Sequence, residues 1–358
     1  VTTVCVMAIM ASIATWKMLK EGQTVSAFSG MIVADRMGMF LTALFSGTTA
    51  FIALISASHQ REHKWEVGEF YGLMMLATAG MAMIAMAGDL ITVFIGIETM
   101  SLAVYVMCAA RRNRSGAEGA MKYFLMGAFA SGFLVYGMAL LYGATGTTNL
   151  HMIRTALASG SSSALTIAAV FMLVIAFGFK VSAIPFHMWT PDAYEGAPTP
   201  VTGFMAGAVK AAAFAGVIRV FLGGLGGDVV PLGGMGWANI FAILAAITMT
   251  VGNVAALRQE NIKRMLAYSS IAHAGVLLVG VVAAGMDPHG ESLKSILFYL
   301  LAYSVATVGA FSVVVWIGNR EQERTLVSDW HGLGAQYPAA ALAMTLFMLS
   351  FAGIPPTA

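Results

Sequence analysis

Residues 176–219 read AFGFKVSAIPFHMWTPDAYEGAPTPVTGFMAGAVKAAAFAGVIR, and this stretch decides the fold. It places Lys180 and Lys210 inside long apolar runs, and between them stand Pro185, His187 and the polar turn TPDAYEGAPTP. A lysine inside a hydrocarbon segment costs roughly 3 kcal/mol or more and by default marks a path for charge. Two such lysines on either side of a proline-broken helix indicate a transport site near the middle of a membrane.

The composition is typical of an integral membrane protein. Of the 358 residues, 59% are hydrophobic and only 10% are charged, compared with roughly 25% charged in soluble domains. The net charge of +2 is too small to suggest nucleic acid as a partner. Cys5 and Cys108 are too few for an iron–sulfur cluster, and the sequence has no glycine-rich nucleotide motif. We therefore expect no cofactor and no metal in this chain, and any redox cofactor in another one.

Apolar runs of about 20 residues predict membrane-spanning helices. We predict an all-α polytopic membrane protein in which the sixth span is discontinuous, because it contains Lys180 and Pro185. About eleven spans are predicted, at residues 1–16, 33–57, 70–87, 90–109, 120–143, 164–188, 200–222, 237–257, 265–285, 293–317 and 338–356.

Basic residues alternate between the two sets of predicted loops. The even-numbered loops carry ten and the odd-numbered loops four: Arg61, Lys64, Arg111, Arg112, Arg114, Arg258, Lys263, Arg264, Arg320 and Arg324 against Lys17, Lys20, Arg154 and Lys294. Because basic residues concentrate in cytoplasmic loops, we predict that the even loops face the cytoplasm. Val1 then lies on that side, and we expect a further helix to precede the first apolar run.

The break in the sixth span has an echo near residue 358. KVSAIPFHM at 180–188 resembles SFAGIPPTA at 350–358, with small residues followed by Ile-Pro in an apolar helix. A match this short is easily made by chance, but paired broken helices in two halves are typical of an inverted repeat. Proline also frees a backbone carbonyl, which inside a bundle can bind water.

Lys180 and Glu98 are the first candidates for a charge path. A desolvated lysine can accept and release a proton within a working cycle; the alternative is a lysine that snorkels to the membrane surface. Glu98 stands in LITVFIGIETMSLAVYVM, where a buried carboxylate is expensive unless it is paired or protonated. We hypothesise that Glu98 is the charge partner of Lys180, with a protonated Glu98 bonded to backbone as the alternative.

Three further lysines are candidates for the same path. Lys210 lies among alanines and glycines, which allow close helix approach and leave room for water; the alternative is a lysine paired with an acid for packing. Lys263 lies near the start of the predicted helix NIKRMLAYSSIAHAG (261–275), whose Tyr, Ser and His residues make a polar track possible. Lys122 follows the basic stretch RRNRSGAEGA, so snorkelling is as plausible for it as proton transfer.

His187 and His273 lie in apolar segments. A membrane histidine is either a hydrogen-bonded structural residue or a proton relay, because its pKa lies near neutrality. Neither histidine has a second ligand four residues on, which argues against a metal site.

These residues carry a resemblance to a known family. FKVSAIPFHMWTPDAYEGAPTPVT (179–202), GIETMSLAVYV (96–106), RSGAEGAMKYFLMGAFASGF (114–133) and NIKRMLAYSSIAHAG (261–275) resemble the antiporter-like subunits of proton-pumping NADH–quinone oxidoreductase, respiratory complex I. These subunits are related to Mrp-type cation/proton antiporters, and the FHMWTPDAYEGAP string favours the subunit N (subunit 2) branch. The resemblance covers essentially the whole chain and is strongest from Asp89 to Gly275.

The resemblance implies fourteen membrane helices with two inverted five-helix repeats, each containing a broken helix. On this basis residues 1–69 are N-terminal helices, 70–222 the first repeat with one proton half-channel, and 237–358 a truncated second repeat. The resemblance implies proton-path roles for Glu98, Lys180, Lys210, Lys263 and His273. It also implies a lysine after the second Ile-Pro, beyond residue 358, so we expect this chain to be part of a longer subunit.

The expected function is proton translocation in the membrane arm of a bacterial complex I. The resemblance implies flavin, iron–sulfur clusters and quinone in partner subunits, neighbours of the subunit K and M types, and a place in the cytoplasmic (inner) membrane. One alternative is a subunit of an Mrp-type Na⁺/H⁺ antiporter, which would exchange sodium without any redox enzyme. The other is a scaffold that does not pump, although several buried charges argue against it.

Overall fold

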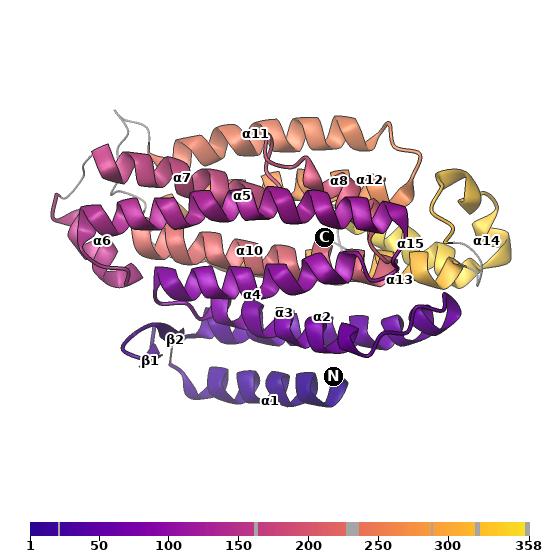
Figure 1. The fold of residues 1–358 in the computed structure, drawn as a ribbon, viewed down its shortest axis with the longest axis horizontal. Helices are drawn as coiled ribbons and strands as arrows, with labels where there is room; N and C mark the ends of the chain where they lie inside the picture. The colour runs from indigo at the N-terminus through magenta and orange to yellow at the C-terminus, as the bar shows by residue number, and fades with distance from the viewer. Residues whose placement is uncertain (21, 161–163, 227–235, 288, 319–322, 355–358) are drawn as a thin grey trace.

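The computed structural model describes residues 1–358 except 21, 161–163, 227–235, 288, 319–322 and 355–358. Long helices run lengthwise beside one another, and the composite helix formed by residues 199–225 is the most buried of the long spans (Figure 1). The described elements are, in order, α1 (Thr2–Met18), β1 (Val25–Ala27), β2 (Ile32–Ala34), α2 (Arg36–Glu62), α3 (Glu69–Ala85), α4 (Leu90–Cys108), α5 (Arg114–Thr145), α6 (Leu150–Ala158), α7 (Ala164–Val181), α8 (Trp189–Gly196), α9 (Thr199–Phe204), η1 (Met205–Val209), α10 (Lys210–Val217), η2 (Ile218–Leu225), α11 (Trp237–Ala256), α12 (Ile262–Met286), α13 (Glu291–Ile317), η3 (Val327–Trp330), α14 (Leu333–Gln336) and α15 (Pro338–Phe351).

All eleven predicted spans correspond to helices in the structure. Within the described residues, eight helical spans are long and apolar enough to cross a membrane, and α1, α3 and α15 are shorter apolar helices. Several helices begin where a short polar side chain accepts a hydrogen bond from the first turn, which satisfies a backbone N–H that has no partner inside the helix. These N-terminal caps are Asp35, Asp89, Asn113, Asn149 and Asn261.

Small elements were not predicted. The antiparallel strands β1 and β2 form a hairpin between α1 and α2, and α6 is a short amphipathic helix. Trp189–Gly196, expected to be a polar turn, forms the helix α8. Proline is compatible with a first helical turn, where backbone N–H groups lack partners in any case, so Pro191 does not prevent this.

The predicted helix break at Pro185 is confirmed. Helix α7 ends at Val181, and Ser182 takes a left-handed conformation with φ 65°. The N–H of Ser182 bonds to the carbonyl of Phe179 and that of Ala183 to Gly178, which closes the helix with a Schellman motif. The chain resumes as α8 seven residues after Ser182.

Helix α15 ends in the same way. Gly353 has φ 74°, and the N–H groups of Gly353 and Ile354 bond to the carbonyls of Ser350 and Leu349. The left-handed residue here, Gly353, directly precedes Ile354, whereas Ser182 lies two positions before Ile184. Pro355 and the residues after it lie outside the described part of the chain, so the second half of the Ile-Pro echo stays a prediction.

Two stretches of π-helix interrupt the central composite helix. They are η1, directly before Lys210, and η2, which begins at Ile218. A π turn inserts one residue more than an α turn and shifts the faces of the helix on either side of it; such turns often occur at functional sites. The regular segment α10 between them begins with Lys210, so that the lysine lies at the change of helix geometry.

The loops separate into two ends as the charge pattern predicted. At one end, which we call the basic end, side chains from several even-numbered loops meet around Glu323: His59, Arg111 and Lys263 all contact it. At the opposite end, single bridges join Ile32 to Ala87 and Asp89 to Asn149. In Figure 1 the hairpin and α6 lie at the left and α14 at the right. The alternation of loops between two ends is therefore confirmed, and the assignment of the basic end to the cytoplasm stays a prediction.

Candidate functional site

Lys180 lies on the last turn of α7, directly before the break, and is buried at 8% exposure. Its Nζ donates to Ser101 Oγ at 2.8 Å and to the hydroxyl of Tyr105 at 3.5 Å, both on α4. Ser101 in turn donates to the carbonyl of Ile97 at 2.5 Å. The lysine therefore points inward to hydroxyl groups, and the snorkelling alternative does not describe its position.

Glu98, the hypothesised charge partner of Lys180, makes no direct ion pair with it, and its role as charge partner stays a prediction. Its Oε1 accepts from Ser131 on α5 at 2.5 Å, and Lys180 bonds instead to Ser101, one turn further along α4. The reason is helix geometry: residues three apart share a face, and the shorter Ser101 side chain receives the lysine while Glu98 turns to α5. The carboxylate of Glu98 on α4 and the ammonium of Lys180 on α7 are therefore separated by hydroxyl groups.

Lys210 has no acidic partner among the described residues. It is buried at 3% exposure, and its Nζ donates to the backbone carbonyl of Ser270 at 2.7 Å and to the hydroxyl of the same residue. The alternative, that Lys210 pairs with an acid for packing, is therefore wrong among the residues that the structure describes. A buried ammonium held only by neutral oxygens is a group that can give up its proton.

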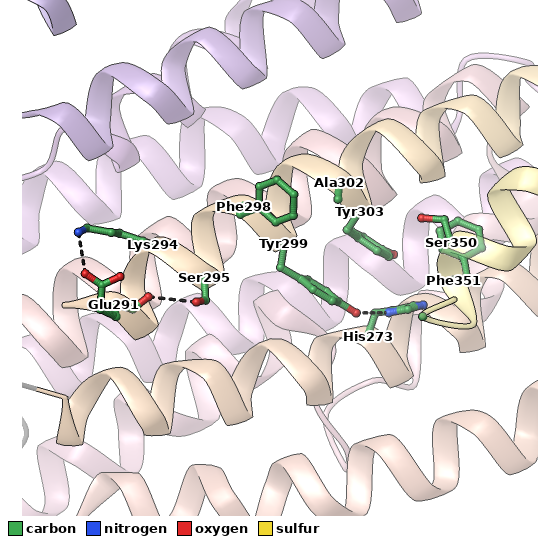
Figure 2. A pocket seen from close by; sticks show the side chains of 11 residues that line it. His273, Glu291, Lys294, Ser295, Phe298, Tyr299, Ala302, Tyr303, Ser350 and Phe351 are labelled. Carbon is green, nitrogen blue, oxygen red and sulfur yellow. Dashed lines mark hydrogen bonds and ion pairs between the residues drawn. The ribbon is translucent and has the colours of Figure 1, made fainter. Parts of the chain in front are cut away.

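His273 lies one turn after Ser270 on α12, so that these two polar side chains lie on one face of the helix. Its Nδ1 is 2.6 Å from the hydroxyl of Tyr299 on α13, and its ring packs against Tyr303 and Phe351. The histidine lines a cavity of about 560 Å³ between α12, α13 and α15. Figure 2 shows the His273–Tyr299 contact in one part of this cavity and a Lys294–Glu291 pair in another.

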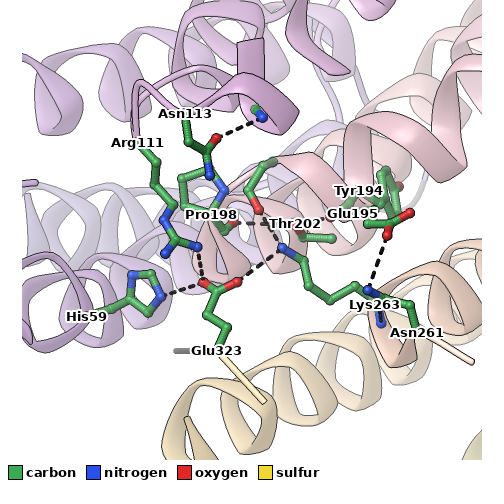
Figure 3. A network of polar contacts seen from close by, with 12 residues as sticks. His59, Arg111, Asn113, Tyr194, Glu195, Pro198, Thr202, Asn261, Lys263 and Glu323 are labelled. Carbon is green, nitrogen blue, oxygen red and sulfur yellow. Dashed lines mark hydrogen bonds and ion pairs between the residues drawn. The ribbon is translucent and has the colours of Figure 1, made fainter. Parts of the chain in front are cut away.

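Lys263 lies at the basic end of α12 and is almost completely buried, at 1% side-chain exposure. Its Nζ donates to the carbonyl of Ala197, after α8, at 2.5 Å and lies 3.6 Å from Glu323 Oε2. Glu323 also contacts His59 Nε2 at 2.9 Å and Arg111 Nη1 at 3.0 Å (Figure 3). These three contacts outweigh the effect of burial and hold the pKa of the Glu323 carboxyl far below its usual range.

The sequence did not identify three members of this cluster as site residues: His59, Arg111 and Glu323. His59 and Glu323 are 264 positions apart, and each looks like an ordinary residue at the end of a helix or in a loop. The only signal was indirect, because all three belong to the loops or helix ends that the charge alternation places on one side.

Lys122 lies apart from the buried lysines. Its side chain is 45% exposed and bonds to Glu118 Oε1 and Asp192 Oδ2, both at 2.8 Å. Arg264 joins the same cluster through Asp192 and Glu195. Burial would raise the pKa of Asp192, but the two basic partners outweigh it and lower the pKa. This geometry fits a clamp between α5, α8 and α12 better than a relay, although no contact tests the predicted role of Lys122 directly.

His187 lies within the break and is half-buried. Its Nδ1 is buried without a hydrogen-bond partner in the described residues. The structure joins it by hydrogen bond to none of the candidate lysines, again within that part of the chain. Its role as a relay stays a prediction.

Close helix packing fixes the helix that carries Glu98 and Ser101. A Cβ atom added at Gly80 of α3 would lie 2.6 Å from the backbone nitrogen of Met100 and 2.7 Å from the carbonyl oxygen of Gly96. Such distances require glycine, so the backbones of α3 and α4 touch directly. This contact fixes the position of α4 against α3. Helix α4 carries Ser101 and Tyr105, the partners of Lys180.

The fold and these side chains define a class of protein. A multi-pass membrane bundle with buried lysines on either side of a broken helix, each held by hydroxyl or carbonyl oxygens, is typical of a transporter of protons or small cations. The chain belongs to the NADH:quinone oxidoreductase/Mrp antiporter transmembrane family, whose family model matches residues 87–358.

Relatives and solved structures agree with this family. The chain is 48% identical over 345 residues to NADH-quinone oxidoreductase subunit N 1 of Sorangium cellulosum, covering 94% of this chain and 68% of that protein. It is 45% identical over 340 residues to NADH-quinone oxidoreductase subunit N of Trichlorobacter lovleyi, with the same coverage of both. A chain of respiratory complex I from Thermus thermophilus is 34% identical with a TM-score of 0.81, covering 99% of this chain and 72% of that one.

The fold is shared more widely. A chain of the Mrp complex from Dietzia sp. has a TM-score of 0.88 at 24% identity, covering 99% of this chain and 66% of that one. At this identity the likeness concerns the fold alone. The relatives with higher identity are named as subunit N, so the subunit N branch is favoured over the Mrp alternative.

Proposed function

We propose that this chain is the part of an NADH–quinone oxidoreductase subunit N that moves protons through the membrane. The observation that carries the proposal is the placement of Lys180, Lys210 and Lys263. All three are buried, and two of them have only neutral oxygen partners among the described residues. A protein that only had to pack its helices would be at least as stable with apolar side chains there.

The proposed path joins two groups of hydrogen-bonded residues, one at Lys180 and the other around Lys210 and α12. Lys180 lies at the break and Lys210 at the π-helix, and Ser270 and His273 continue from Lys210 along one face of α12. A proton on Lys180 passes to Lys210 through water or hydroxyl groups and onward along α12. A change in the charge of Glu98, one turn from Ser101, would alter how firmly Lys180 holds its proton.

The whole enzyme supplies the driving reaction. We propose that the partners are the other subunits of complex I, with neighbours of the subunit K and M types, and that flavin, iron–sulfur clusters and quinone are held there and not in this chain. The support is the naming of the relatives and of the Thermus thermophilus structure. We further propose a bacterial inner-membrane location, and a division into N-terminal helices (1–69), a first repeat (70–222) and a second repeat (237–358).

The proposal is tested with Lys180→Ala in membrane vesicles that carry the complete enzyme. Redox-driven proton pumping and electron transfer to quinone are measured in the same preparation. We expect both rates to fall at least tenfold while the complex stays assembled, since removing a proton-transfer group typically costs about 10²–10⁴ in rate. Lys17→Ala, an exposed lysine on α1, is the control and should leave both rates unchanged.

Wild-type rates of both reactions in Lys180→Ala would show that Lys180 has a structural role only. Sodium-dependent proton exchange in the absence of any redox substrate would instead support the Mrp-type function.

A further inference from the structure

The cluster around Glu323 at the basic end has more bases than acids. Three basic side chains, from α2, from the segment after α4 and from α12, meet one carboxylate: His59, Arg111 and Lys263 (Figure 3). Arg111 always carries its charge, so Arg111 and Glu323 together are electrically balanced. Any proton held by His59 or Lys263 is therefore an extra positive charge, which the cluster can take up and release.

The end of α2 has unsatisfied polar atoms beside this cluster. His59 Nδ1, Gln60 Nε2 and Trp65 Nε1 are all buried without a hydrogen-bond partner among the described residues. His59 and Gln60 are 1% and 3% exposed. Buried polar groups are nearly always satisfied by protein or by water. Three such atoms within seven residues point to water between the cluster and the surface.

His63, directly after α2, packs against the buried ring of His59 and is itself partly exposed to solvent. Its ring is half-buried and lies 4.4 Å from that of His59. Burial, together with the charges of His59 and Arg111, lowers the pKa of His63, so that its ring releases a proton more readily than a free imidazole. The contacts then run from His63 to His59, from His59 to Glu323 and from Glu323 to Lys263.

We propose that His59, Glu323 and Lys263 form the port through which protons from the basic end reach the buried lysines. This rests on the proposed function, because it supplies that path with its protons. His59 takes a proton from water at Nδ1 and releases the one on Nε2 to Oε1 of Glu323. The carboxyl group of Glu323, which faces Lys263 with Oε2, then turns so that the protonated Oε1 faces Lys263, gives its proton to the neutral amine and is again a carboxylate. The ring of His59 regains its first tautomer through the surrounding water.

Because of these charges, the port passes one proton at a time. While Lys263 is protonated, it and Arg111 keep Glu323 ionised and the port is closed to a second proton. Once Lys263 has passed its proton inward, one of the positive charges facing Glu323 is gone and the carboxylate can carry the next. Ser270, seven residues further on the same face of α12, holds Lys210, so Lys263 stands two helical turns from the next base.

A metal ion is the other occupant that this chemistry allows. Ligand atoms of His59, His63 and Glu323 lie within 4.8 Å of one another. However, Arg111 and Lys263 already contact Glu323, and a divalent cation would meet their repulsion. The observations favour a proton.

The test is His59→Gln in the complete complex in membrane vesicles. Glutamine can still donate a hydrogen bond to Glu323 but cannot carry a proton. We expect proton pumping to fall at least about tenfold with assembly intact. In His59→Ala, added imidazole should restore part of the pumping, because it diffuses into the space of the missing ring. The matched control is His151→Gln, an exposed histidine on α6 at the opposite end, which should pump like the wild type.

Three outcomes would overturn the port. If His59→Gln pumps normally while His59→Ala does not and imidazole has no effect, His59 has a structural role only. If both pump normally while Lys180→Ala does not, protons enter elsewhere and the proposed function stands. If Lys180→Ala also pumps normally, the proposed function itself fails. Should His59→Gln not assemble, Glu323→Asp carries the test, because it keeps the charge but cannot reach both His59 and Lys263; normal pumping there would overturn the port.

Discussion

The role of a single buried lysine can be separated into charge and packing at Lys210. Lys210→Met keeps a long flexible chain but removes the proton site. Because burying an ammonium among neutral oxygens is costly, we expect the melting temperature of the purified complex to stay the same or rise, while pumping falls at least about tenfold. Lys20→Met, on an exposed loop, should change neither quantity. A lower melting temperature with normal pumping would identify Lys210 as a packing residue.

The residues differ in how far the sequence predicts them. Lys180 and Lys210 stand out because charged residues are rare in apolar runs, and both are buried as expected. Lys263 was counted among the basic loop residues, and its burial was not expected. The partners of the first two lysines, Ser101, Tyr105 and Ser270, do not stand out, because hydroxyl side chains occur throughout such helices. The sequence could not predict which side chain of α4 accepts the hydrogen bond of Lys180, because the choice between Glu98 and Ser101 depends on a rotation of α4 that sequence spacing does not give.

At the scale of the elements, the contact between α3 and α4 gives a matched pair of variants. Gly80→Val places a side chain against the backbone of α4, whereas a Cβ atom at Gly72 on the same helix meets nothing within 4 Å, so that Gly72→Val is the control. Overpacking of this kind typically costs about 1–3 kcal/mol. We expect Gly80→Val to lower the melting temperature and the pumping rate, because it displaces the helix that carries Glu98 and Ser101. Equal melting temperatures for the two variants would contradict this contact.

How well each helix could be predicted depends on the sequence pattern that it leaves. Apolar length located all eleven spans, and Pro185 located the break in the sixth. The π-helices η1 and η2 gave no signal, since the extra residue in such a turn is set by packing against neighbouring helices and not by local propensity. Helix α8 was missed because its polar residues are typical of a turn, and its ion pairs to Lys122 and Arg264 come from distant segments.

At the scale of the whole molecule, the open question is which end faces the cytoplasm. The positive-inside rule assigns the basic end to it, and the proposed port then takes protons from the cytoplasm. Arg61, at the basic end, is 80% exposed, and His151 is exposed at the opposite end. The native cysteines, Cys5 and Cys108, are buried and should react poorly with a polar thiol reagent. Single cysteines at positions 61 and 151 therefore report the two ends.

We expect a membrane-impermeant maleimide to label His151→Cys in intact cells, and to label Arg61→Cys only after the membrane is opened. The unsubstituted chain is the control for the buried cysteines. The opposite pattern would place the basic end outside the cell. In that case the Glu323 cluster would be the site of proton release: the same bases would lie at the end of the path, and His59→Gln would then trap protons inside the lysine row instead of starving it. The orientation of the bundle thus decides the direction in which its charged groups work.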